Sequence, residues 1–264
     1  MKFEELNKAN IENLSALWEK YGKYPETAWN MPQLNANTHW PNRFWFSWED
    51  FTKPAFNHVF NQLDTFNNLL KNVSKDAVFP IWESPELLSN NAPQLKSLEQ
   101  CFKANDFELG FKQVAMYLEL PTGSKNLPPD PKSAIAIKKI SSSTEVQSWV
   151  DIASESFGYE IDAMIIEKLL NDKDIRLLLA YENGQAVATA MLYKTGDIIG
   201  VHQVGVAIEH QGKGIAFTLM QHIINICNAW FGKYVVLQAS DAGLSLYKRL
   251  GFKQQFLIMN YQHV

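Results

Sequence analysis

The chain has 264 residues, of which 46% are hydrophobic and 20% are charged, and its formal net charge is −4. This composition is sufficient for folded cores, and no apolar run approaches the roughly 18 residues that span a bilayer, so a membrane-spanning protein is excluded. Nucleic-acid binding needs concentrated Lys and Arg, and the chain has no such block, so that class is excluded too.

The first part of the chain is charged at its start and then rich in tryptophan. The opening residues, Met-Lys-Phe-Glu-Glu-Leu-Asn-Lys, contain no apolar signal-peptide core, which predicts a cytoplasmic protein. Trp18, Trp29, Trp40, Trp45, Trp48 and Trp82 either pack in a core or line an acceptor pocket. Alternation predicts a strand at residues 43–48, and helical spacing predicts a helix at residues 54–70.

A short sequence in this half recurs near the end of the chain. Leu109-Gly-Phe-Lys-Gln113 is repeated as Leu250-Gly-Phe-Lys-Gln254, and a strand-like stretch follows each copy. A strand and a helix also precede each copy, at residues 76–82 and 92–104 in the first case. The matching contexts predict two related halves.

Residues 121–133 are dense in Pro, Gly and polar side chains and have no apolar periodicity, which predicts a linker. We therefore expect an N-terminal domain at residues 1–120 and a C-terminal domain at residues 134–264, each of ordinary size. The first half has no strand that runs into a Gly-x-Gly helix start. Only the second half is expected to bind a cofactor.

The second half begins with alternating strands and helices. Strands are predicted at residues 134–140, 176–182, 185–193 and 198–208, and helices at residues 144–156 and 161–170. Asn183-Gly184 is a strong hairpin signal between two of these strands, and Thr195-Gly-Asp is a second turn candidate.

The next segment joins an apolar strand to a glycine-rich turn and a long helix. Ile215, Leu219, Ile223 and Cys227 recur every four residues, and Gly232 is the expected helix stop. A buried strand is predicted at residues 234–239. Because a helix N-terminus offers unpaired N–H groups and glycine allows close approach, the turn predicts an anion-binding site.

Two common phosphate motifs fit this turn poorly or incompletely. A Walker A loop fails because the glycines are too widely spaced and Gly214 follows Lys213. A dinucleotide fingerprint finds its first two glycines in Gly212 and Gly214 but has Phe217 at the third, with Asp241 near the end of the next strand. A dinucleotide-binding enzyme remains an alternative.

Gln211-Gly-Lys-Gly-Ile-Ala216 resembles the [Arg/Gln]-x-x-Gly-x-[Gly/Ala] loop of the GNAT superfamily of N-acetyltransferases. Downstream, Leu246-Tyr-Lys-Arg-Leu-Gly-Phe252 is similar to that superfamily's later Leu-Tyr-x-x-x-Gly-Phe segment. The resemblance covers the chain from about Ala134 to its end. It implies an α/β (α+β) fold with two GNAT-like domains, each a mixed, mostly antiparallel sheet flanked by helices, the N-terminal one degenerate.

The resemblance also implies acetyl-CoA as the cofactor and CoA as a product. The loop is expected to hold the pyrophosphate, and the strand before it is expected to splay from its neighbour, pair with the pantetheine arm and polarise the thioester carbonyl. Gly205 within this strand is compatible with a bulge. The implied cofactor-binding residues are Val204, Gly205, Val206, Gln211, Gly212, Lys213, Gly214, Ile215, Ala216, Phe217 and Ser240.

Two residues are candidate catalysts. Tyr247 matches the family's tyrosine, which implies a general acid beside the departing sulfur, although it is also a candidate for packing alone. His202 is the preferred base because it lies on the same strand as Val204 and Val206 at even spacing, although it is also a candidate structural histidine. Glu155, Glu160 and Asp162 are weaker candidates for the base.

The predicted activity is transfer of an acetyl group to a primary amine of a small molecule, peptide or protein, by direct attack in a ternary complex. No metal, nucleic acid or membrane takes part in this prediction. The N-terminal half is expected to cap the cleft, recognise substrate or form a homodimer. A non-catalytic acyl-CoA sensor or interaction module is the second alternative.

Overall fold

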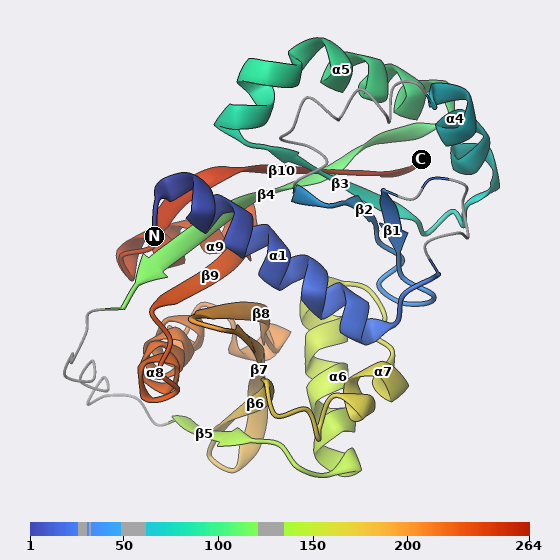
Figure 1. Cartoon of the computed structure of the whole chain (residues 1–264). Coiled ribbons are helices and arrows are strands. Elements are labelled where there is room, and N and C mark those ends of the chain that lie inside the picture. The colour runs from blue at the N-terminus through green and yellow to red at the C-terminus, as the bar shows by residue number, and fades with distance from the viewer. Residues whose placement is uncertain (26–30, 32, 49–61, 121–134) are drawn as a thin grey trace. The chain divides into compact units, whose positions relative to one another are not determined.

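The computed structural model describes residues 1–25, 31, 33–48, 62–120 and 135–264. The predicted linker and the first part of the helix predicted at residues 54–70 lie outside these residues. Packing divides the chain (Figure 1) into two compact units that are each discontinuous in sequence. Unit 1 comprises Met1–Ala115, Gln238–Ala242 and Gln254–Val264, and unit 2 comprises Met116–Leu237 and Gly243–Lys253.

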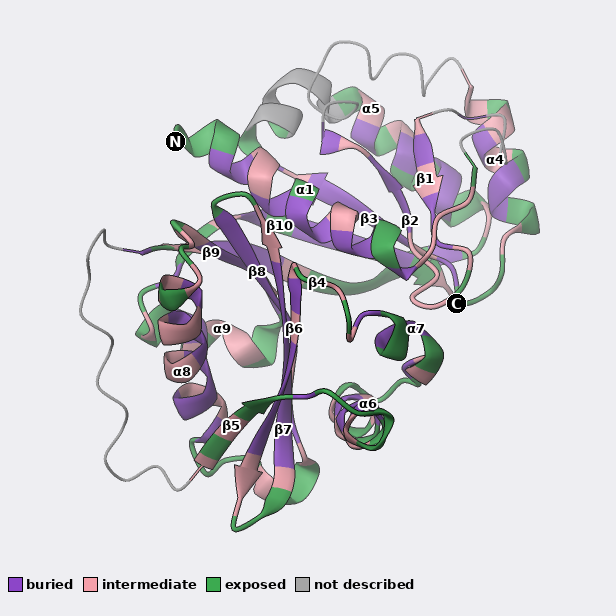
Figure 2. Ribbon diagram, turned by 60° about the horizontal axis from the view of Figure 1, so that its bottom comes forward, coloured by how far each residue is buried: buried purple, intermediate pink, exposed green. Residues whose placement is uncertain are grey.

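Unit 2 is built on a mixed sheet with helices on both faces. Its antiparallel strands are neighbours in chain order, and β8 then pairs in parallel with β9. The views agree that α8 lies on one face and that α6 and α7 lie on the other (Figures 1 and 2). The elements are β5 (Ile135–Lys139), α6 (Ser143–Phe157), α7 (Ala163–Lys168), β6 (Ile175–Glu182), β7 (Gln185–Thr195), β8 (Ile198–Val206), α8 (Ile215–Ala229), β9 (Tyr234–Ala239) and α9 (Asp241–Arg249).

Local sequence signals explain the ends of several of these elements. Asn183 and Gly184, between β6 and β7, have φ values of 52° and 83°, the left-handed pair that a tight hairpin requires. Ser142 begins α6 with a capping box, in which its side chain accepts from the N–H of Glu145 and the Glu145 carboxylate accepts in return. The predicted hairpin and the mostly antiparallel sheet flanked by helices are confirmed.

Unit 1 contains an aromatic core. Trp18 lies 5.3 Å from Trp45 and 6.0 Å from Trp82 between ring centroids, and all three side chains are buried. Core packing therefore accounts for these tryptophans, whereas Trp29 lies outside the described residues. The elements are α1 (Phe3–Tyr21), β1 (Leu34–Ala36), β2 (Phe44–Phe46), α4 (Leu63–Asn72), β3 (Val78–Glu83), α5 (Pro85–Ala104), β4 (Phe107–Glu119) and β10 (Lys253–His263).

The two sequence halves exchange their last strands. The strand order is β3-β10-β4-β9, so β10 of the second half pairs with β3 of the first, and β4 of the first half pairs with β9 of the second. This exchange explains why residues 254–264 pack with unit 1 and residues 116–120 with unit 2. The compact units therefore do not follow the predicted boundaries at residues 120 and 134, and that division of the sequence stays a prediction.

The two copies of the repeated pentapeptide do not occupy equivalent structural positions in the two halves. Leu109–Gln113 lies inside β4, whereas Leu250–Phe252 precede β10. The equivalent positions are Asp106 and Gly251, which both follow a helix with positive φ (59° and 91°), each with a buried phenylalanine next in sequence. The repeat is thus a helix, a left-handed turn and a strand, and the identical letters are offset by four residues.

The end of α8 also differs from the prediction. The sequence predicts Gly232 as the stop, but the position just after the C-cap is Phe231, which has φ of 60° and is 83% exposed. Gly232 is needed for another reason: a Cβ there would lie 2.7 Å from Cδ1 of Ile199. Packing against Ile199 of β8 therefore favours glycine at 232, whereas the left-handed position at 231 is held by a residue with a side chain.

Replacing Phe231 with Gly is expected to stabilise the protein by about 1 kcal/mol, because glycine adopts positive φ without the steric cost that other residues carry. Phe231→Ala is the matched control, since it removes the same exposed ring but keeps the strain. Urea unfolding of both variants measures the difference. Equal stability of the two variants would contradict a left-handed Phe231.

Candidate functional site

The predicted glycine loop lies between β8 and α8. After Val206 the chain forms a short 3₁₀ turn, Ile208–His210, and reaches α8 through Gly212 and Gly214, whose φ values are 74° and 82°. A Cβ on either glycine would meet no atom within 4 Å. These glycines are therefore required by the left-handed backbone and leave an open surface above the loop.

The loop offers a row of unused donors. The N–H of Gln211 donates to the Ile208 carbonyl and that of Thr218 donates to the Gly214 carbonyl. Between them, no acceptor in the described part of the chain takes the backbone N–H groups of residues 212–217. Gly214 caps α8 without any side-chain bond. Free N–H groups at the positive end of a helix suit a phosphate, so the donor chemistry fits a pyrophosphate.

Two side-chain bonds hold the loop in place. The Gln211 side-chain amide donates to the Val206 carbonyl at 3.0 Å, which ties the loop to the end of β8. Nδ1 of His210 lies 3.0 Å from Oε2 of Glu182, at the end of β6. Gln211 therefore positions the loop through its side chain.

Besides Lys213, a second cationic side chain lies near the loop, and the sequence analysis did not predict it. The guanidinium of Arg249, at the end of α9, lies 4.8 Å from the ring centroid of Phe217 in the first turn of α8. Lys213 is exposed on the loop itself. Arg249 comes from a segment about 30 residues downstream, and local pattern carried no signal that its helix would contact α8.

Before the loop, β8 and β9 separate. Their pairing covers only Ile198–Gly200 of β8 with Tyr234–Val236 of β9. The register between β7 and β8 then shifts, because His202 pairs with Met191 and Gly205 with Thr189. Gln203, at this bulge, has φ of 52°, and its carbonyl accepts from the Thr189 hydroxyl at 3.0 Å. Within the described residues of unit 2, the pairing of β8 with β9 thus ends at Gly200 and Val236, before the loop.

Gly205 is required by packing at this bulge. A Cβ there would lie 2.9 Å from Oγ and 3.0 Å from Cβ of Ser156, at the end of α6. The end of α6 therefore lies directly against the part of β8 that has left β9.

Replacing Gly205 with Ala is expected to destabilise the protein by about 1–3 kcal/mol, the usual cost of overpacking a filled site. The double variant Gly205→Ala, Ser156→Gly removes the clashing atoms and should recover part of that loss. Urea unfolding of the wild type, both single variants and the double variant gives the coupling free energy. Purely additive effects would contradict the close approach of α6 to β8.

The bulge alters the predicted placement of His202. Even spacing predicted a face shared with Val204 and Val206, but the extra residue at the bulge shifts the alternation. His202 instead shares a face with Gly205, whose Cβ direction points to α6. The His202 side chain is 8% exposed, so it lies buried on the α6 face of the sheet.

Tyr247 lies on α9, the helix whose end contacts the loop through Arg249. Its ring packs edge-on against Phe252, with 5.7 Å between centroids, and burial raises the pKa of its phenol to about 12. Within the described ranges no group hydrogen-bonds the hydroxyl, and the hydroxyl is not among the buried polar atoms that lack a partner. Packing therefore holds the ring of Tyr247 in place, and its hydroxyl makes no hydrogen bond to any described residue.

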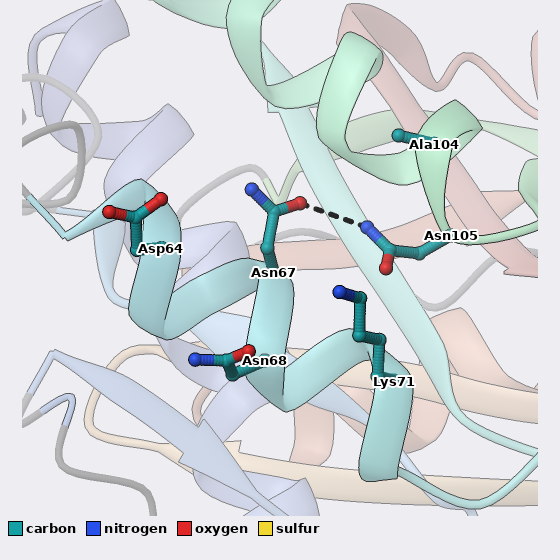
Figure 3. Close-up of a pocket in the computed structure, with 6 residues that line it drawn as sticks. All are labelled: Asp64, Asn67, Asn68, Lys71, Ala104 and Asn105. Carbon is teal, nitrogen blue, oxygen red and sulfur yellow. Dashed lines mark hydrogen bonds between the residues drawn. The ribbon is translucent and has the colours of Figure 1, made fainter.

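The remaining predicted cofactor residue, Ser240, is grouped with the other unit. Ser240 and Asp241 belong to unit 1, whereas the loop belongs to unit 2. Unit 1 also has a hollow of about 510 Å³ (Figure 3), in which the Asn105 amide donates to Asn67 at 2.9 Å. Its other polar lining side chains are Asp64, Asn68 and Lys71, which are exposed. No cluster of metal-binding side chains occurs among the described residues.

Comparison with known families identifies this arrangement. The model of the acetyltransferase (GNAT) family matches residues 143–252, from the start of α6 to Phe252. These residues belong to the GNAT family. The match includes the loop, the bulged strand and Tyr247, and members of the GNAT family use acetyl-CoA as the acetyl donor. A search of curated proteins gave no significant match.

Solved structures extend the likeness to most of the chain. A GCN5-related N-acetyltransferase from Kribbella flavida is 17% identical, with a TM-score of 0.60, over 88% of this chain and 86% of that one. One from Sphaerobacter thermophilus is 14% identical, with a TM-score of 0.61, over 88% and 78%. A functionally unknown Staphylococcus epidermidis protein is 16% identical, with a TM-score of 0.56, over 88% and 92%. These likenesses show the fold, a tandem GNAT arrangement.

Proposed function

We propose that this GNAT protein transfers an acetyl group from acetyl-CoA to a primary amine by direct attack in a ternary complex. The observation that carries the proposal is one continuous segment of the chain whose backbone groups are available to a ligand. Its first part is β8 after it leaves β9, and its second part is the loop whose N–H groups are free. In this proposal a thioester and a pyrophosphate both find backbone partners in a single stretch, residues 204–217, consistent with anion binding at helix N-termini.

In this proposal the loop binds the donor through its backbone. The N–H groups of residues 212–217 hold the pyrophosphate, with Lys213 and Arg249 adding positive charge. The free edge of Val204 and Val206 pairs with the pantetheine arm and polarises the thioester carbonyl. Gly205 keeps α6 close to this edge, and Ser240 is retained as a further proposed contact.

The reaction needs a proton taken up at one place and given up at another. A lysine-like amine is neutral in only about one molecule in several thousand at pH 7, so a base must remove its proton. The neutral amine attacks the carbonyl carbon, the C–N bond forms, and the C–S bond then breaks. The departing thiolate receives the proton of Tyr247, the nitrogen of the new amide gives up its second proton to restore the Tyr247 phenol, and the base releases its proton to solvent.

His202 is our proposed base, acting directly or through water. Its buried position on the α6 face makes Glu155 and Glu160, which lie at the end of α6 and just after it, the rivals for this role. Asp162 is weaker, because its carboxylate already accepts from the N–H groups of Met164 and Ile165 at the start of α7. The burial of both His202 and Tyr247 is the observation that favours a non-catalytic acyl-CoA sensor as the second candidate.

Calorimetric titration with acetyl-CoA, in parallel with NADH, tests the donor, and amine-dependent release of the CoA thiol tests turnover. We expect micromolar binding of acetyl-CoA, none of NADH, and thiol release that depends on a primary amine. NADH binding without acetyl-CoA binding would support the dinucleotide alternative. Acetyl-CoA binding without thiol release on a broad amine panel would support the sensor.

A further inference from the structure

Two aromatic side chains lie exposed at the end of α6. The rings of Phe157 and Tyr159 stack with 5.8 Å between centroids and 24° between planes, and the side chains are 38% and 44% exposed. Met164, at the start of α7, is 71% exposed. Two exposed rings stacked in this way offer a flat apolar surface to a ligand. We call Phe157 and Tyr159 the aromatic platform.

The platform lies beside the end of β8 that extends past its pairing with β9. Ser156, one residue before Phe157, lies against Gly205, and the Tyr159 hydroxyl lies 3.5 Å from the Gln203 side-chain amide. Gln203 is a non-glycine residue with positive φ, a conformation that persists where the surrounding structure enforces it and that clusters at functional sites. The platform therefore lies beside the stretch of β8 that is free of β9.

Hydrogen bonds fix the platform at both ends. Gly158 ends α6 in the left-handed conformation and donates to the Ser154 carbonyl at 2.9 Å. The Ser154 hydroxyl accepts from the N–H of Ile161 at 3.1 Å, and the Asp162 carboxylate caps α7. A surface held in this way offers its rings to a ligand with little further loss of conformational entropy.

The segment that carries the platform has charge of one sign. Residues 140–167 contain no Lys or Arg, but they contain six acidic residues, Glu145, Asp151, Glu155, Glu160, Asp162 and Glu167. Glu155 and Glu160 flank the platform in sequence. A field of this sign attracts an ammonium group and repels a carboxylate or a phosphate.

We infer that the acceptor is a small cationic primary amine with a flat apolar body, such as an arylalkylamine, and without an acidic group. The inference rests on the proposed function and names its substrate class. The body stacks on Phe157 and Tyr159, which directs the amino group toward the free stretch of β8. Gln203 and Tyr159 set the edge of this site, and Glu155 and Glu160 select against anionic amines.

Four ethyl- and propylamines that differ in one group test the inference. They are 2-phenylethylamine, n-propylamine, 3-aminopropanoate and 2-aminoethyl phosphate, each assayed for kcat/KM at saturating acetyl-CoA. Stacking and burial of the ring should favour 2-phenylethylamine over n-propylamine by about tenfold or more. The two anionic amines should be poorer than n-propylamine by about tenfold, a difference that falls as salt is added.

Variants separate stacking from general damage. Phe157→Ala and Tyr159→Ala should each lower kcat/KM for 2-phenylethylamine by about fivefold to tenfold while changing n-propylamine by less than about twofold. Phe231→Ala is the matched control, because it removes another exposed ring of unit 2, at the end of α8. Glu160→Gln should raise the relative activity on 2-aminoethyl phosphate.

The outcomes distinguish this inference from the proposed function. If acetyl-CoA does not bind, the proposed function fails and the inference fails with it. Two results would overturn the inference alone, when acetyl-CoA binds and amines are acetylated. The first is that 2-phenylethylamine has no advantage over n-propylamine. The second is that the platform variants lower the activity on these two amines equally. Preference for an anionic amine, or turnover of none of the four, also overturns it.

Discussion

Replacing Gly214 with Glu is expected to abolish acetyl-CoA binding, with a loss of affinity of about 100-fold or more. Gly214 caps α8 at the centre of the free N–H groups, and nothing lies within 4 Å of a Cβ there, so the side chain fits. Its carboxylate would compete for the same donors and repel the pyrophosphate. Two unit charges 4 Å apart interact by about 1 kcal/mol in water and about 4 kcal/mol near a protein surface, and 100-fold corresponds to about 2.7 kcal/mol.

Gly196→Glu is the matched control for this variant. Gly196 lies in the turn between β7 and β8 and also has positive φ (59°), and a Cβ there would meet no atom within 4 Å, so the substitution carries the same backbone strain outside the loop. Calorimetry should show normal acetyl-CoA binding for Gly196→Glu and none for Gly214→Glu, with both variants folded by circular dichroism. Retained affinity in Gly214→Glu would place the pyrophosphate away from the loop.

Local features of unit 2 were predictable because adjacent residues determine them. The hairpin at Asn183-Gly184 follows from two residues that tolerate positive φ, and the periodicity of Ile215, Leu219 and Ile223 gives the buried face of α8. The glycine loop follows in the same way, since its backbone needs left-handed positions. The donors that the proposal uses were therefore visible in the sequence.

Features that depend on distant contacts were not predictable from local pattern. The exchange of β4 and β10 is decided by pairing between strands far apart in the chain, and apolar alternation does not name a partner. The left-handed end of α8 falls on Phe231, and a Cβ at Gly232 would lie 2.7 Å from Cδ1 of Ile199, a residue distant in sequence. In the candidate site, the bulge at Gln203 moved His202 onto the α6 face, and the contact of Arg249 with Phe217 joins two helices separated by β9.

Replacing Tyr247 with Phe is expected to lower kcat by about 100-fold, the lower end of the usual contribution of a positioned proton donor, and to leave the Kd for acetyl-CoA unchanged. The ring packs against Phe252, so Phe preserves the packing and removes only the hydroxyl. Tyr181→Phe is the control, because Tyr181 is another tyrosine of unit 2 whose pKa burial raises, and it lies on β6. Its kcat should change by less than about twofold, within the usual range for substitutions away from a site.

The pH dependence gives a second test of the same group. Burial raises the pKa of Tyr247 from 10 to about 12, so the phenol stays protonated as the pH rises through 10 and can still donate. The ratio of wild-type to Tyr247→Phe kcat should therefore remain constant from pH 7 to about pH 10 and fall only as the pH nears 12. A ratio that already falls between about pH 8 and 10 would mean that the phenol ionises in its ordinary range. A ratio near one at every pH, with chemistry shown to limit the rate, would remove Tyr247 from catalysis and leave it a packing residue.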